Sequence, residues 1–257
     1  MRSTLVYDLP TRLFHWLFAG LLVLSFTIAK TVDDETIQFS FHMLSGFVLA
    51  ILVLWRIMWG VIGSRYAKFA GFDLNIFNLK NYFLGILSGS NKRWPGHNPA
   101  SSWAAIIMFS LVLGLVVSGY FMTTGYKESI EEIHEFMANA FVILVIAHVT
   151  GIIFHSLRHK DRIALSMLDG KKDTSNVAVT PINSERLFAA ILLLALIISS
   201  VYYLASHFNS ENRTLSMFGK TLQLGENEHE SDIEDILQNQ NTDDVHNNKK
   251  HYKEDQD

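Results

Sequence analysis

The sequence contains no cysteine, and this absence narrows the redox chemistry open to a chain of 257 residues. Without thiols there are no disulfides, no cysteine-held iron–sulfur clusters and no covalently attached c-type haem. A glycine-rich dinucleotide fingerprint is also absent, so hydride transfer from a nicotinamide cofactor is not expected. Any redox cofactor must therefore be held by other ligands, and its electrons must come from another protein, a quinol or a small diffusible species.

Acidic residues are also absent from one part of the sequence, the middle of the long apolar runs. Hydrophobic residues make up 49% of the chain and gather into runs, whereas charged residues gather between them. Four runs approach or pass the length of about 20 residues that crosses a bilayer, and a fifth follows. The five runs cover residues 13–29, 39–58, 103–124, 133–157 and 187–205. No aspartate or glutamate lies in the central part of any run, which argues against a proton pump or ion-coupled transporter.

The distribution of basic residues predicts the orientation of these spans, because lysine and arginine concentrate in cytoplasmic connections. The N-terminus and the connections of residues 59–102 and 158–186 are basic, whereas the other two connections are mainly acidic. Five spans with a cytoplasmic N-terminus place every basic connection inside and the C-terminal tail outside. The first run is expected to be a retained span, because no small-residue cleavage pattern precedes Thr31.

Two segments outside the spans have a character of their own. Residues 74–87 mix apolar and polar side chains and are expected to form a helix on the inner leaflet, and WPGHNPA at 94–100 predicts a rigid turn. Residues 209–257 carry twelve acidic side chains against five basic ones, so this acidic tail is expected to be mostly disordered. A capping box of Ser231 and Glu234 predicts one short helix within it. A solvated tail is favoured over a docking arm for a basic partner.

Several of the eleven histidines lie within or near the spans. One histidine near a helix end is as easily an interfacial side chain as a ligand, but four in depth-matched pairs indicate a function. His134 and His148 are fourteen residues apart, close to four helical turns, which places both on one side of a helix and about 21 Å apart. Because successive spans run in opposite directions, His42 and His134 lie at similar depths near the outer surface of the membrane. His15 and His148 lie towards the inner surface.

Each pair comes from two different helices, as a bis-histidine haem inserted into a helix bundle requires. Zinc usually takes four protein ligands, or three and a water, whereas haem supplies four nitrogens itself and needs only two axial ligands. The inner pair has an alternative, because His155 lies seven residues after His148 and faces nearly the same way. Spacing alone therefore leaves either residue as the inner ligand.

Other polar side chains near the inner surface are candidates for the same site. Arg12 and Arg56 lie at the inner ends of the first two spans and suit haem propionates through bidentate pairing, although charge that only sets the topology explains each at least as well. Arg56 is the better candidate of the two, because it lies before Trp59 and Gly60, where a helix ends. His97 and Asn98 suit contacts with quinone or propionates, but a structural turn is the favoured interpretation.

The motifs around these histidines resemble a bacterial di-haem cytochrome b family that includes the b-type cytochrome subunits of nickel–iron hydrogenases. The resemblance covers about residues 5–172 and rests on YDLPTRLFHW at 7–16, HMLSG at 42–46, WRIMWG at 55–60, GHNPA at 96–100, HE at 134–135, HVTG at 148–151 and MLDG at 167–170. It implies two haem b groups in a four-helix core, with the matching ligands His15, His42, His134 and His148, and so favours His148 over His155.

The resemblance also implies electron exchange between membrane quinone and a periplasmic redox partner, such as a cytochrome c or a dehydrogenase or hydrogenase subunit. We therefore expect an all-α integral protein of the bacterial inner membrane. A haem-binding four-helix domain at 1–172 would be followed by a linker and fifth span at 173–208 and by the acidic periplasmic tail at 209–257.

The expected function is that of an electron-transfer subunit of a respiratory chain, without a nucleic-acid partner. One alternative is a stand-alone quinone-linked oxidoreductase acting on a small species such as superoxide, and another is a redox-inactive membrane anchor. Haem content separates the anchor from the other two functions, and a copurifying periplasmic partner separates the subunit from the stand-alone enzyme.

Overall fold

A computed structural model describes residues 3–89, 97–160, 163–173 and 180–225. Five long helices account for most of it, and they confirm the five expected spans with somewhat wider bounds. The helices are α1 (Leu9–Thr31), α2 (Ile37–Ile62), α4 (Pro99–Phe121), α5 (Lys127–His159) and α7 (Leu187–His207). The described chain has four continuous helical stretches that are long and apolar enough to cross a membrane, and the longest of them, Pro99–His159, contains both α4 and α5.

The chain reverses between α4 and α5 at a kink, where Thr124 and Gly125 depart from helical backbone angles. A π-helical turn, η2 (Met122–Tyr126), joins the two helices, and Gly125 within it has φ +95°. Glycine is suited to this position because it has no Cβ to oppose a left-handed backbone. The π-turn explains why one apolar stretch yields two antiparallel helices.

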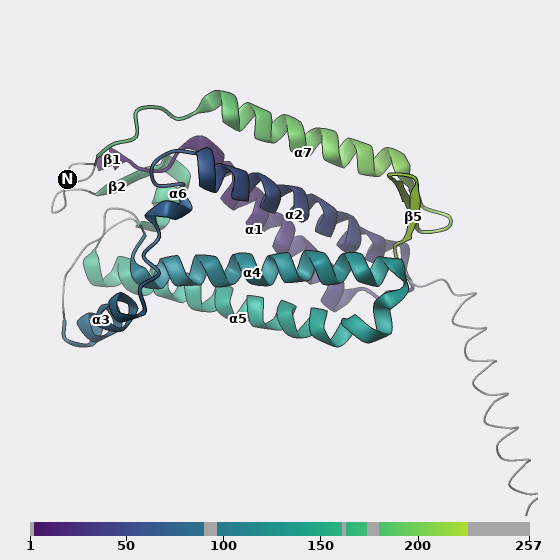
Figure 1. Cartoon of the computed structure of the whole chain (residues 1–257), viewed down its shortest axis with the longest axis horizontal. Coiled ribbons are helices and arrows are strands. Elements are labelled where there is room, and N and C mark those ends of the chain that lie inside the picture. Colours follow the sequence, from purple (N-terminus) through teal and green to yellow (C-terminus); the bar gives the residue numbers. More distant parts are fainter. Residues whose placement is uncertain (1–2, 90–96, 161–162, 174–179, 226–257) are drawn as a thin grey trace, which may run out of the picture.

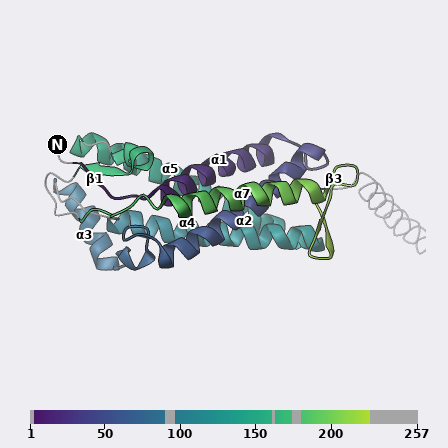
Figure 2. The same ribbon diagram turned by 90° about the horizontal axis from the view of Figure 1, so that it is seen from above.

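Four of the helices form a bundle, and the fifth lies against one side of it. Helix α1 packs along α2, α4 packs along α5, and α2 also contacts α4. Helix α7 packs on both α1 and α2, so it covers the side of the bundle away from α5 (Figure 1). Figure 2 shows α7 running lengthwise along the bundle between the ribbons of α1 and α2.

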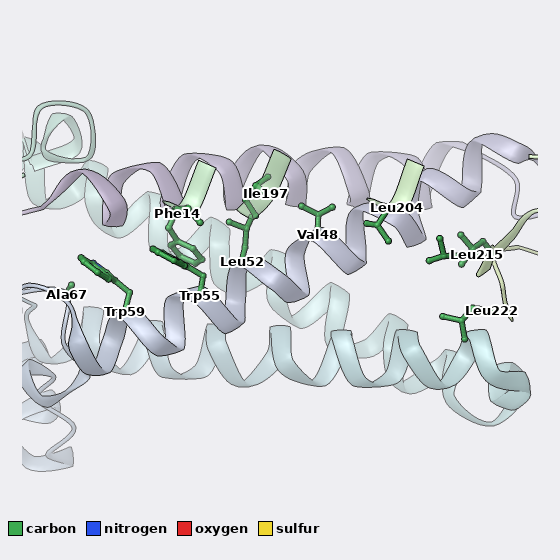
Figure 3. Close-up of a cluster of buried hydrophobic side chains, with 12 residues drawn as sticks. Phe14, Val48, Leu52, Trp55, Trp59, Ala67, Ile197, Leu204, Leu215 and Leu222 are labelled. Atoms are coloured by element: carbon green, nitrogen blue, oxygen red, sulfur yellow. The ribbon is translucent and has the colours of Figure 1, made fainter. Parts of the chain in front are cut away.

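The buried core follows α2 along its whole length. A cluster of apolar side chains from α1, α2 and α7 continues into leucines that follow α7 (Figure 3). Its members include Phe14, Val48, Leu52, Trp55, Trp59, Leu193, Ile197, Leu204, Leu215 and Leu222. A second cluster lies around Phe141, which is 2% exposed, with Val53 and Val112. These clusters hold the helices at the spacing that positions the polar groups described below.

The helix expected at 74–87 is present as α3 (Ile76–Leu87), which begins at the capping residue Asn75. It lies crosswise to the bundle and packs on the start of α4 (Figure 1). Arg158 near the end of α5 donates a 2.9 Å hydrogen bond to the carbonyl of Ile86 and so ties α3 to α5. Several apolar side chains of α3 are exposed, among them Phe77. Its location on the inner leaflet stays a prediction, and residues 94–96 of the expected turn lie outside the described residues.

Small elements close the two ends of the bundle. At one end, β1 (Ser3–Leu5) pairs antiparallel with β2 (Lys171–Asp173), close to η1 (Phe69–Gly71), η3 (Ile163–Leu165) and α6 (Ser166–Asp169). At the other end, β3 (Phe208–Asn209), β4 (Thr214–Met217) and β5 (Lys220–Gln223) form an antiparallel sheet. We call these the N-terminal end and the hairpin end.

The sheet at the hairpin end occupies the first part of the tail that was expected to be mostly disordered. Residues 209–225 are folded, because Leu215, Leu222 and Leu224 face inwards and are at most 3% exposed. Only Glu211 of the twelve acidic side chains lies in this folded part. The average composition of residues 209–257 concealed this apolar pattern. The capping box at 231–234 lies outside the described residues.

Candidate functional site

The hairpin end brings together two histidines from helices that are distant in the sequence. His42 lies in the second turn of α2 and His134 in the second turn of α5. Their ring centres are 6.3 Å apart, and the ring planes make an angle of 81°. The sequence had predicted this pairing from chain direction alone.

Serines of the other two bundle helices hold both imidazoles in place. His42 Nδ1 lies 2.8 Å from the carbonyl oxygen of Ser25 and 2.9 Å from its hydroxyl. His134 Nδ1 lies 2.8 Å from the hydroxyl of Ser118, which itself donates to the carbonyl of Gly114. Each Nδ1–H therefore has an acceptor, and the Nε2 lone pair of each ring is left to bind a metal.

Sequence reasoning missed Ser25 and Ser118, although both carry a usable signal. Each is a small polar side chain in an apolar run, placed at the depth of the outer histidines. Such a hydroxyl inside a span needs a partner, and a histidine at the same depth is a natural one.

The spacing of His42 and His134 fits two axial ligands of one metal. Bonds of about 2.0–2.1 Å from each imidazole nitrogen, plus about 1.1 Å from each nitrogen to its ring centre, predict a separation of about 6.2–6.4 Å between the rings. The measured 6.3 Å falls in that range. No cluster of three or more histidine or carboxylate ligands occurs among the described residues, so the other donors must come from the cofactor.

A flat macrocycle also needs room beside its ligands. Gly46, one turn after His42, and Gly151, three residues after His148, have no atom within 4 Å of where a Cβ would lie. The closely packed helix pairs of the described chain are α1–α2, α4–α5 and α2–α4, whereas α5 makes no comparable backbone contact with α1 or α2. The helices that supply each histidine pair thus stand apart where a porphyrin would enter. The residues present fit haem b.

The N-terminal end contains the second pair. The imidazole of His15 is close enough to His148 to interact with it electrostatically, and it stacks on Trp16 at 5.2 Å. His155 stacks instead on His159 of its own helix, with ring centres 4.4 Å apart. The proximity of His15 and His148 agrees with the ligand pair that the resemblance implies, and the choice of His148 over His155 stays a prediction.

The two arginines predicted at this end have different surroundings. Arg56 is 6% exposed, and its guanidinium lies 4.8 Å from the ring centre of Phe69 and 5.5 Å from that of Phe109. Gly60 permits this packing, because a Cβ there would lie 2.2 Å from the Phe69 ring. Arg12 instead donates to the carbonyl of Leu168 at 2.6 Å and forms an ion pair with Glu185. Arg56 thus retains binding capacity, whereas Arg12 mainly joins α1 to the segments before α7.

Unpaired hydrogen-bonding groups gather at the N-terminal end. Among the described residues, the buried side-chain atoms without a hydrogen-bond partner are Thr11 Oγ1, Arg12 Nε, Trp55 Nε1, Arg56 Nη1, Ser64 Oγ, Trp103 Nε1 and Ser156 Oγ. All belong to helix ends or turns at that end. Four are N–H donors, which accept no hydrogen bonds themselves. Because buried polar groups are normally paired, this end is suited to a ligand that supplies acceptors, such as carboxylates.

His97 lies at the N-terminal end but is not a member of either histidine pair. It packs against Phe72 at 4.7 Å between ring centres, and edge-on to Tyr7 at 6.4 Å. Burial first, and then the nearby charges of Lys172 and Arg56, lower the pKa of His97 to about 3. The ring is therefore neutral at physiological pH.

Acid should weaken the fold through His97. Its pKa is about 3 when folded against 6.5 when unfolded, so the unfolded chain binds the extra proton between these values. The stabilisation from a neutral His97 is complete above about pH 6.5 and is lost as the pH falls towards about 3. We expect the thermal midpoint in detergent to fall less between about pH 7.5 and about pH 5 in His97→Gln than in the unaltered protein. Equal falls in both proteins would contradict this assignment.

An apolar layer separates the two pairs. Phe141 lies seven residues from both His134 and His148, and its ring packs edge-on against Phe18 of α1, 6.4 Å away. The cluster around it also contains side chains of α2 and α4, among them Val53 and Val112. All four bundle helices thus meet in a layer that excludes water from the middle of the bundle.

Comparison with known proteins agrees with this geometry. A family described as "Prokaryotic cytochrome b561" matches residues 6–170. The "Probable Ni/Fe-hydrogenase B-type cytochrome subunit" of Rhodobacter capsulatus is 22% identical over 216 residues, covering 66% of this chain and 81% of the relative. The protein of the same description from Cupriavidus necator is 22% identical over 213 residues, covering 66% and 87%. The "Probable Ni/Fe-hydrogenase 1 B-type cytochrome subunit" of Escherichia coli K12 is 22% identical over 151 residues, covering 49% and 63%.

No solved structure gives a significant match. The family match spans more than half of the chain and includes both histidine pairs, and it confirms the resemblance seen in the motifs. The chain therefore belongs to the prokaryotic cytochrome b561 family, and it is a multi-pass membrane cytochrome of the b type that acts in electron transfer.

Proposed function

We propose that the chain binds two haem b groups and relays electrons through the membrane between quinone and a periplasmic redox partner. The observation that carries this proposal is the His42–His134 pair, 6.3 Å apart with both Nδ1 atoms held by serines. His15 and His148 form the second ligand pair, and residues 1–172 form the haem-binding domain. Haem iron supplies one-electron chemistry, because it alternates between ferric and ferrous states.

The residues of the chain divide the remaining tasks. Four histidines hold the cofactors, and Ser25 and Ser118 fix the ring orientation at the hairpin end. Arg56, with its free Nη1, offers a charge-assisted hydrogen bond to a propionate, and Arg12 offers its free Nε in the same way. The Phe141 layer keeps water and protons out of the path that electrons take.

The likeness to hydrogenase cytochrome subunits suggests the class of partner. The relatives are described as B-type cytochrome subunits of nickel–iron hydrogenases. We infer that the partner here is a periplasmic hydrogenase or a similar dehydrogenase, which exchanges electrons at the hairpin end. The basic connections favour a cytoplasmic N-terminal end, and we infer that quinone reacts there and that the hairpin end faces the periplasm.

Vesicles test the relay directly. The purified protein is placed in liposomes that contain a quinol, with ferricyanide, which does not cross the membrane, outside. We expect quinol-dependent reduction of ferricyanide, its loss in His134→Ala, and its retention in the control His207→Gln, whose histidine lies at the end of α7 outside both pairs. Haem-loaded protein that passes no electrons from quinol would contradict the quinone assignment while leaving the haem sites intact.

Removing the Ser118 hydroxyl should raise the midpoint potential of the hairpin-end haem. The Nδ1–H···Oγ hydrogen bond makes the His134 imidazole a stronger electron donor, which favours ferric iron. If Ser118→Ala weakens that preference tenfold, the potential rises by about 59 mV for one electron. Redox titration of the haem absorbance measures this shift. Ser110→Ala is the matched control, because Ser110 is on the same helix and bonds only to the carbonyl of Ile106. An equal shift in both variants would exclude the proposed role of Ser118.

A further inference from the structure

The β4–β5 hairpin lies outside the part of the chain that matches the family. The match ends at residue 170, whereas the hairpin follows α7 and begins at Thr214. Its strands lie at the end of the bundle where α2 and α5 begin (Figures 1 and 2). His42 and His134 lie near the starts of these two helices. Nothing in the family match therefore explains what the hairpin does there.

Residues that flank the hairpin are fastened to the start of α2 and to the turn that leads into it. The hydroxyl of Ser40, in the first turn of α2, donates a 2.6 Å hydrogen bond to the carbonyl of Leu224, and Ser40 is fully buried. Arg213 Nη1 donates to the carbonyl of Glu35 in the turn before α2. Gly225 has φ +110°, and a Cβ there would lie 3.0 Å from the carbonyl oxygen of Asp34, so only glycine fits without strain. These contacts reach to within two residues of His42.

The hairpin also reaches the turn that leads into α5. Strand β5 contacts η2, which directly precedes α5 and its His134. The two turns are joined to each other by a 2.8 Å ion pair between Lys127 and Asp34, and its hydrogen bond lowers the pKa of Asp34. A second ion pair, between Lys30 and Glu135, lies one residue from His134.

Apolar packing supports these polar contacts. Leu215, Leu222 and Leu224 belong to the same buried cluster as Val48, and Met43 and Leu44 pack against that cluster. Met43 and Leu44 directly follow His42 in α2. The leucines of the hairpin segment and the side chains that follow His42 thus belong to one continuous apolar cluster.

We propose that the β4–β5 hairpin is a positioning element of the hairpin-end haem site, clasping the turns that precede His42 and His134 so that the two imidazoles stay in register. This inference rests on the proposed haem ligation. By this proposal, a segment outside the family match helps to set the geometry of the hairpin-end haem site. The other haem site does not depend on it.

Two substitutions weaken the attachment of the hairpin without replacing a haem ligand. Ser40→Ala removes the hydrogen bond to Leu224, and Arg213→Gln removes the bond to Glu35. Lys220→Gln is the matched control, because Lys220 is an exposed residue of the same hairpin. We expect the Ser40→Ala/Arg213→Gln double variant to keep both haems, and to change the midpoint potential and the low-spin ferric electron paramagnetic resonance signal of one haem only.

Leu215→Asp places a charge in the buried face of the hairpin and should detach it. We expect this variant to lose up to half of its haem b, with the remaining haem unchanged in potential and spectrum. Limited proteolysis within residues 209–225 shows whether the hairpin has come away. Detachment without any change in either haem would overturn the inference, and so would equal changes in both. Absence of haem from the unaltered protein would refute the proposed function itself, which is a separate result.

Discussion

Replacing His134 with alanine is expected to halve the haem b content of the purified protein and to leave one haem with unaltered properties. His134 and His42 are the two side chains at the hairpin end whose Nε2 atoms are free for a metal. Without His134, His42 supplies only one of the two axial bonds to the haem iron. The other pair lies beyond the Phe141 layer and shares no ligand with this one. The loss should therefore be confined to one site.

The measurement is the pyridine haemochrome assay, expressed per mole of chain, in the unaltered protein, His134→Ala and the control His207→Gln. Two, one and two haems are the predicted ratios. His42→Ala should reproduce the His134→Ala result, because both variants disrupt the same site. Full haem retention in either ligand variant would disprove the assignment of that pair.

The second large effect concerns the N-terminal end, where spacing alone allowed two ligands. His148→Ala should remove one haem, whereas His155→Ala should keep both. The physical reason is that His148 interacts with His15 across the bundle, while the ring of His155 stacks on His159 of its own helix.

The electron paramagnetic resonance spectrum of ferric haem distinguishes these variants further. His148→Ala should retain the low-spin signal of the hairpin-end haem and lose the other. If His155→Ala lost a haem and His148→Ala did not, the inner ligand would be His155, and α5 would have to sit about two turns deeper relative to α1 than the structure places it.

Much of the fold follows from features that act locally along the chain. Apolar runs bounded by charge gave all five spans, and the direction of successive spans correctly paired His42 with His134 in space. The hairpin at 214–223 was missed because the buried Leu215 and Leu222 within it, and Leu224 after it, are sparse among polar residues. These leucines pack in one cluster with side chains of α2, which is distant in sequence, and of α7, which precedes the hairpin. The β1–β2 pairing joins residues about 170 positions apart and leaves no local pattern.

The candidate site, too, was predictable only where it depends on features local to one helix. The relative positions of the histidines on α5 were predictable because a spacing of fourteen residues fixes both the face and the depth of two side chains on one helix. The serine partners were not, because a hydrogen bond between helices depends on how those helices are rotated, which Ser25 and Ser118 do not reveal by themselves. The sequence favoured Arg56 over Arg12 as a propionate ligand, but only tertiary contacts show that Arg12 is ion-paired and that Arg56 is enclosed by aromatic rings.

The most direct test of the account is a redox titration of the purified protein combined with its haem-to-chain ratio. Two haem b per chain, titrating as two one-electron components of which only one responds to Ser118→Ala, is the predicted result. A single haem per chain, or two haems that both respond to Ser118→Ala, would contradict the claim that each end of the bundle holds its own bis-histidine haem.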